Sequence, residues 1–305
     1  MKILVVGAGA VGGYFGGRLA EAGRDVTFLV RPRRAESIRK QGLQIVSPHG
    51  DAKVHPKLVL AGEIASPYDL ILLSVKAYGL DAAMDDFAPA IGPETIILPM
   101  LNGMRHLDVL SRRFGEQHVV GGFCRIFSDV DSAGRILQLN DAHLIAFGEI
   151  KGGTSARTRA LNEGLQGAGF DVNHSEDIIK DMWEKWLMLA SLGAITCLLR
   201  GDMGEVEAAP GGKDTALRIL AECAAISAAN GYPPSEKDLG RARSLISTPG
   251  SKLTVSMYRD MNNGGPVEAD HILGDLIERG RSRGVECPLF EAAYANLCVY
   301  QRRLK

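Results

Sequence analysis

The sequence predicts an α/β protein in which an N-terminal, doubly wound parallel sheet is followed by an all-α C-terminal domain. Up to about residue 170, apolar runs of strand length alternate with amphipathic segments of helix length. From about residue 175 onward, strand-like runs nearly stop and long helical patterns take over. A glycine-rich turn also directly follows the first apolar run, as is common where a strand passes into a helix of such a sheet.

Six strands are expected in the N-terminal part. Most of these runs carry apolar residues on both faces, which is typical of strands covered by helices on either side of a parallel sheet. Turns containing glycine or proline separate them. The predicted strands span residues 2–7, 25–30, 69–75, 95–100, 118–122 and 144–148.

Five long helices are expected in the C-terminal part, with breakers such as Gly231-Tyr232-Pro233-Pro234 between them. We therefore predict one domain over residues 1–172 and a helical domain over residues 173–305. The predicted helices span residues 177–199, 214–230, 236–246, 267–283 and 289–303.

Composition excludes several classes of protein. The 35 basic residues against 36 acidic residues lack the basic excess of a nucleic-acid binder. The five cysteines form no CxxC pair, so we expect no structural zinc site. Their odd number and lack of a pairing pattern also favour a reducing compartment. The apolar, uncharged stretch of residues 186–199 is shorter than the roughly 20 residues of a membrane span. The sequence thus favours a cytoplasmic protein without membrane or nucleic-acid partners.

A GxGxxG pattern lies between the first strand and a helix predicted over residues 11–22. In that context the pattern predicts a Rossmann dinucleotide site, because the helix N-terminus offers N–H donors and a positive dipole to a pyrophosphate. The first glycine permits the tight turn, the second lets the ligand approach the backbone, and the third lets the helix pack closely. The loop consists of Gly7, Ala8, Gly9, Ala10, Val11 and Gly12.

The residue after the second strand indicates which dinucleotide binds. An NAD site usually places Asp or Glu there, whereas this chain has Arg31, with Arg33 and Arg34 close behind. A guanidinium suits the 2′-phosphate of NADP(H), and a carboxylate would repel it. We therefore expect NADP(H), although an exposed arginine cluster after a strand is also a common surface feature.

After the glycine loop and Arg31, the chain carries five further stretches in order: Val75-Lys76-Ala77, Leu101-Asn102-Gly103-Met104, Trp183-Glu184-Lys185, Ser256-Met257-Tyr258-Arg259-Asp260 and Val267-Glu268-Ala269-Asp270. In these residues, and over nearly its whole length, the chain resembles the ketopantoate reductase (2-dehydropantoate 2-reductase) family, with similar length and the same two-domain division.

This resemblance implies NADPH-dependent reduction of a 2-oxo acid to the 2-hydroxy acid, with Lys185 as the general acid that protonates the carbonyl oxygen. It places Glu268 beside that lysine and Ser256 at the substrate carboxylate. It places Lys76 at the cofactor or substrate and Asn102 at both. Taken without the family, each is an ordinary helix, strand-end or turn residue.

The chain departs from the family pattern beside the lysine. Family members carry asparagines four and eight residues after it, and here those positions hold Leu189 and Gly193. The three positions share one helix face. We expect fewer hydrogen bonds to the substrate, more volume at Gly193, and a substrate bulkier or less hydroxylated than ketopantoate. Alternatively, Ser191 or Thr196 could replace the lost amides.

Two other functions remain open from the sequence. A non-catalytic NADP-binding sensor would need only the cofactor loop, so the presence of Lys185, Ser256 and Glu268 argues against it. A related hydroxy-acid or opine dehydrogenase would share the architecture. The expected partner is a small 2-oxo acid, and the apolar helices of the second domain favour a homodimer.

Overall fold

A computed structural model describes residues 1–304 and divides the chain into two compact units. Unit 1 contains Met1–Leu101 and His106–Ile179, and unit 2 contains Asn102–Arg105 together with the chain from Lys180 onward. The sequence placed the division after residue 172 and gave no sign that Asn102–Arg105 packs with the helical unit.

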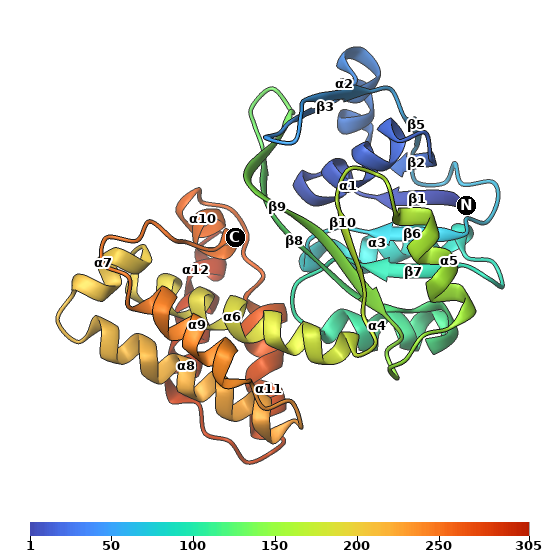
Figure 1. Ribbon diagram of the computed structural model, residues 1–305. Coiled ribbons are helices and arrows are strands. Elements are labelled where there is room, and N and C mark those ends of the chain that lie inside the picture. Colours follow the sequence, from blue (N-terminus) through green and yellow to red (C-terminus); the bar gives the residue numbers. More distant parts are fainter. Residues whose placement is uncertain (305) are drawn as a thin grey trace. The chain divides into compact units, whose positions relative to one another are not determined.

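A five-stranded parallel sheet forms the centre of unit 1 (Figure 1). The strand order β5-β2-β1-β6-β7 has the crossovers of a doubly wound sheet, which confirms the predicted fold class. β1, β6 and β7 are buried along almost all their length, in keeping with their uniformly apolar sequences. The strands are β1 (Lys2–Val6), β2 (Asp25–Leu29), β5 (Lys57–Val59), β6 (Leu70–Leu73) and β7 (Ile96–Pro99).

A second sheet, which the sequence did not predict, has the order β10-β9-β3-β4, with β8 paired to β9. The predicted short strands 118–122 and 144–148 are wrong in extent, because they cover parts of a long antiparallel hairpin outside the parallel sheet. The half of the hairpin nearer its turn mixes apolar and polar residues, and most of them are half-buried or exposed, so the sequence there has no continuous apolar run. The strands are β3 (Leu43–Val46), β4 (Ala52–Val54), β8 (Gly121–Val130), β9 (Ile136–Gly148) and β10 (Asp171–His174).

Helix α1 (Ala10–Glu21) lies between the two sheets and contacts strands of both. A Cβ added at Gly16 would lie 2.7 Å from Phe28 of the parallel sheet, and one at Gly17 would lie 2.7 Å from Ile45 of the second sheet. Both glycines are therefore required for close approach, one toward each sheet. The other helices of this part are α2 (Pro32–Gln41), α3 (Leu80–Phe87), α4 (Arg105–Phe114) and α5 (Ala156–Leu165), with short 3-10 segments η1 (Ala77–Gly79), η2 (Ala88–Ala90) and η3 (Glu116–His118).

Unit 2 is helical, and within residues 1–304 the last strand ends at His174. α8 packs against α7, α9, α11 and α12. The predicted helix 267–283 instead begins as a π-helix, η4, before α11. The elements are α6 (Ile178–Leu199), α7 (Met203–Ala208), α8 (Gly212–Ala229), α9 (Glu236–Ile246), α10 (Ser256–Asn262), η4 (Asp270–Gly274), α11 (Asp275–Arg281) and α12 (Pro288–Arg303).

Helix α6 is long and apolar enough to cross a membrane by length and composition alone. However, 67% of its most apolar window is buried inside the protein, and Trp186 at its middle is 1% exposed. This burial is that of a core helix, so the apolar sequence of α6 is accounted for by packing.

Candidate functional site

The glycine loop joins β1 to α1 in a tight turn. Gly7 has a φ of +96°, which L side chains rarely adopt. The Ser74 hydroxyl, just after β6, donates to the carbonyl oxygens of Val6 at 2.9 Å and Gly7 at 3.1 Å. A Cβ at Gly12 would lie only 1.9 Å from the same hydroxyl oxygen. The turn is thus fixed by Ser74 and closed to any larger residue at Gly12.

The loop fits a phosphate group. A Cβ at Gly9 would meet nothing within 4 Å, so the backbone there is open to a ligand. Gly9 also caps α1 without a side-chain acceptor, and the first turn of α1 holds no acidic residue. The N–H groups of that turn therefore face the loop with a positive helix dipole and no competing carboxylate.

The other predicted cofactor residues follow strand ends at the same edge of the parallel sheet. Arg31 comes directly after β2 and caps α2, and its side chain is exposed. Lys76 follows β6, is half-buried and begins the 3-10 segment η1. In open parallel sheets ligands bind at the carboxyl ends of strands. Arg31, Lys76 and the glycine loop therefore all lie at the carboxyl edge of the parallel sheet.

In unit 2 the structure brings the predicted general acid into direct contact with the predicted amide. The Lys185 ammonium, half-buried on α6, donates to Asn102 Oδ1 at 3.0 Å. The two residues are 83 positions apart, and Asn102 comes from the turn after β7. This turn is the segment that joins the helical unit, so the lysine and the amide belong to one body.

The π-helix η4 supports both of these residues, and the sequence analysis missed it. Gly103, with φ +75°, lies so close that a Cβ there would be 2.6 Å from the His271 carbonyl oxygen. The indole N–H of Trp186, next to Lys185 in sequence, donates to the Ile272 carbonyl at 3.0 Å. Consecutive carbonyls of η4 therefore hold the Asn102 turn and the lysine helix. π-Helices are frequent at functional sites.

His271 itself is buried beside two cations. Desolvation, together with Arg105 and Arg279, lowers the pKa of the His271 imidazole to about 4. The side chain is therefore neutral near pH 7 and adds no charge next to the Asn102 turn.

Glu268 and Ser256 lie in the same unit as Lys185. Glu268 is 7% exposed, and its backbone carbonyl accepts the Ile272 N–H at 3.0 Å at the start of η4. Ser256 is the first residue of α10 and is half-buried. A carboxylate so well covered is placed for a specific contact more than for solvation of the surface.

The helix face after Lys185 is apolar. Leu189 is half-buried, and Gly193 is buried against Met257, whose Cε would lie 2.8 Å from an added Cβ. The expectation of extra volume at Gly193 is therefore wrong, because the Met257 methyl group fills the space.

Neither proposed replacement for the lost amides is available. The Thr196 hydroxyl donates to the Leu192 carbonyl at 2.7 Å, within its own helix, and is fully buried. Ser191 is 1% exposed and lies about 120° around the helix from Lys185.

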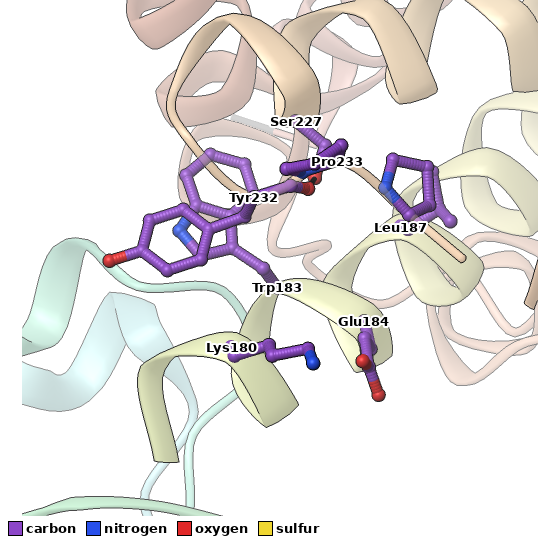
Figure 2. Close-up of a pocket in the computed structure, with 8 residues that line it drawn as sticks. Lys180, Trp183, Glu184, Leu187, Ser227, Tyr232 and Pro233 are labelled. Carbon is purple, nitrogen blue, oxygen red and sulfur yellow. Dashed lines mark hydrogen bonds between the residues drawn. The ribbon is translucent and has the colours of Figure 1, made fainter. Parts of the chain in front are cut away.

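A separate shallow depression on unit 2 contains none of the predicted site residues (Figure 2). The rings of Trp183 and Tyr232 stack at its wall, with centroids 5.5 Å apart and planes at 15°. The depression is lined by Lys180, Trp183, Glu184, Leu187, Ser227, Tyr232, Pro233 and Pro234.

Comparison with known proteins gives the same assignment along the whole chain. Residues 3–152 match the family model "Ketopantoate reductase PanE/ApbA", and residues 177–301 match its C-terminal model. The uncharacterized oxidoreductase YkpB of Bacillus subtilis (strain 168) is 39% identical, with 99% of each chain covered.

Solved structures have the same fold. The 2-dehydropantoate 2-reductase of Geobacter metallireducens GS-15 superposes with a TM-score of 0.90 at 27% identity, covering 98% of this chain and 99% of its own. A D-mandelate dehydrogenase with NADH and anilino(oxo)acetate superposes with a TM-score of 0.89 at 22% identity, covering 100% and 99%. At that identity it shows the fold alone. The chain therefore belongs to the ketopantoate reductase family of nicotinamide-dependent oxidoreductases.

Proposed function

We propose that the protein catalyses NADPH-dependent reduction of a 2-oxo acid to the corresponding 2-hydroxy acid. The observation that carries the proposal is the hydrogen bond from the Lys185 ammonium to Asn102 Oδ1, in a chain whose other unit holds a glycine loop with room for a phosphate at Gly9. Family membership supplies the reaction class.

The glycine loop, the N-terminus of α1 and Arg31 would hold the dinucleotide. When bound, the reduced nicotinamide supplies a hydride to the carbonyl carbon. Arg31 favours NADPH because its guanidinium can pair with a 2′-phosphate. The D-mandelate dehydrogenase of the same fold binds NADH, so the choice of dinucleotide is part of the proposal.

Lys185 would donate the proton that the carbonyl oxygen needs. Its ammonium can hydrogen-bond the substrate oxygen, stabilise the negative charge that develops there, and transfer a proton to it. The bond to Asn102 fixes the direction of the ammonium. Half-burial of the lysine strengthens these interactions, because less water competes for them.

The apolar face after Lys185 favours a substrate with an apolar side chain. Leu189 and Met257 offer contact surface but no hydrogen bond to a substrate hydroxyl. We therefore expect branched or aromatic 2-oxo acids to be reduced at least as efficiently as ketopantoate. Steady-state kcat/KM over a panel of 2-oxo acids checks this, and efficient reduction of ketopantoate alone would reject it.

The general-acid role is tested with Lys185→Ala. We expect turnover to fall by about 10²-fold or more, while NADPH affinity stays near that of the wild type. Lys180→Ala, which removes an exposed lysine from the same helix, is the control and should keep full turnover. Normal turnover of Lys185→Ala would show that Lys185 is not the general acid.

The non-catalytic alternative makes a different prediction for the wild-type protein. Stopped-flow absorbance at 340 nm would then show NADPH binding without oxidation by any 2-oxo acid.

The homodimer also remains a proposal, which sedimentation equilibrium of the purified protein would test.

A further inference from the structure

Arg34 lies against the phosphate loop, unlike its two neighbouring arginines. It sits in the first turn of α2, where Arg31 and Arg33 are exposed and Arg34 is half-buried. Its Nε donates to the Ala8 carbonyl at 3.0 Å, inside the glycine loop. Its Nη1 donates to the Gly134 carbonyl at 2.8 Å, in the turn of the β8–β9 hairpin.

The positive charge of this guanidinium is uncompensated in the described part of the chain. Its polar partners within residues 1–304 are the two carbonyls, and no carboxylate pairs with it there. Nη2 is buried without a hydrogen-bond partner. Burial alone lowers the pKa of the guanidinium. A buried charge normally has a counter-charge, because its desolvation is otherwise costly.

The surroundings hold Arg34 at this place. Gly134 has φ +82°, and a Cβ there would lie 2.8 Å from Arg34 Nη1, so the hairpin turn is shaped around the guanidinium. Its two hydrogen bonds join segments that lie 26 and 100 positions away in sequence. The positive charge of Arg34 is therefore held in place against the glycine loop, unlike the charge of a mobile surface arginine.

We propose that a phosphate group of the bound dinucleotide supplies the missing counter-charge, so that Arg34 is a positioning residue of the cofactor site. The inference rests on the proposed function, because it requires a dinucleotide at the glycine loop. The anion is either the pyrophosphate, common to NADH and NADPH, or the 2′-phosphate of NADPH. Arg34 acts on it through its charge and through the Ala8 carbonyl that it holds.

The experiment compares Arg34→Gln, which removes the charge, with Arg34→Lys, which keeps it but cannot bond both carbonyls in the same way. Arg39→Gln removes an exposed arginine from the same helix and is the control. Dissociation constants for NADPH and NADH are measured by titration calorimetry, and the melting temperature is measured without ligand.

We expect Arg34→Gln to raise the dissociation constant of the dinucleotide by about tenfold or more. Arg34→Lys should stay within about threefold of the wild-type value, because it keeps the positive charge that attracts the phosphate. Arg39→Gln should bind normally. An equal loss for both dinucleotides identifies the pyrophosphate as the counter-ion, and a loss confined to NADPH identifies the 2′-phosphate.

Unchanged binding by Arg34→Gln would overturn the proposal. Equal losses in the Gln and Lys variants, accompanied by a lower melting temperature, would also overturn it, because they show a purely structural clamp. Failure of the proposed function is distinguishable, since the wild-type protein would then bind dinucleotides without turnover or not bind them at all.

Discussion

The Asn102–Gly103 turn connects the chemistry of Lys185 to the backbone of η4. Asn102 receives the lysine's hydrogen bond, and Gly103 is confined by the His271 carbonyl. The ammonium is thus positioned by a residue 83 positions away, which is itself held by a third segment. If Lys185 is the proposed general acid, pre-organisation of this kind would lower the cost of orienting it during the reaction.

The residue-scale prediction concerns Arg31. Arg31→Asp should weaken NADPH binding by more than about tenfold and NADH binding less, because a carboxylate repels the 2′-phosphate and can bond ribose hydroxyls. Arg31 caps α2, and Asp is a favoured capping residue, so the fold should be retained. Fluorescence titration with each dinucleotide measures the effect, with Arg39→Glu as control. Equal losses of affinity for NADPH and NADH would show that Arg31 does not contact the 2′-phosphate.

The sequence allowed the glycine loop to be predicted, because its strand, turn and helix are contiguous and each glycine has a local reason. Lys185 and Asn102 were each predicted only through family resemblance, and their contact was not predicted, since no local pattern links residues so far apart. Arg34 was noted as one of three arginines, but only the structure distinguishes the buried guanidinium from the two exposed ones.

At the scale of elements, α1 is the part of unit 1 most constrained by packing, because it contacts both sheets. Strands buried on both faces have recognisable apolar runs, whereas the half of the β8–β9 hairpin nearer its turn mixes apolar and polar residues and has none. The π-helix η4 could not be predicted either. Its sequence has ordinary helical periodicity, and its contacts with the Asn102 turn and Trp186 are seen only in the structure.

Gly16→Ala tests the packing of α1. The added Cβ would lie 2.7 Å from Phe28 and 2.8 Å from Val5, so we expect a loss of about 1–3 kcal/mol in the free energy of unfolding. Gly240→Ala, on the exposed face of α9 with nothing within 4 Å, is the matched control. It should stabilise by about 0.5–1 kcal/mol. Urea denaturation measures both, and equal effects would contradict the packing argument.

At the scale of the whole molecule, burial of neutral His271 makes stability depend on pH. The pKa of this imidazole is about 4 in the fold, below its usual value of 6.5. Between these values the unfolded chain binds the proton and the native protein does not, so stability falls as pH falls below 6.5 and the loss is complete near pH 4.

We expect His271 to account for about 2 kcal/mol of lost stability between pH 7 and pH 5. His271→Gln should have a correspondingly flatter dependence of unfolding free energy on pH, although its absolute stability is lower. Urea denaturation of both proteins across this range provides the measurement. Parallel pH curves would contradict the prediction, because they would mean that the pKa of His271 is the same in the native and the unfolded protein.

Because Asn102–Arg105 packs with the helices while the chain before and after it packs with the sheets, the polypeptide passes from one unit to the other three times. No single cut can therefore separate two intact halves. A truncated protein beginning at Lys180 would retain Lys185 but lack its amide acceptor, and a fragment ending at Ile179 would carry an orphaned Asn102. An isolated helical unit would therefore need residues Asn102–Arg105 grafted onto it, and a simple truncation would not suffice.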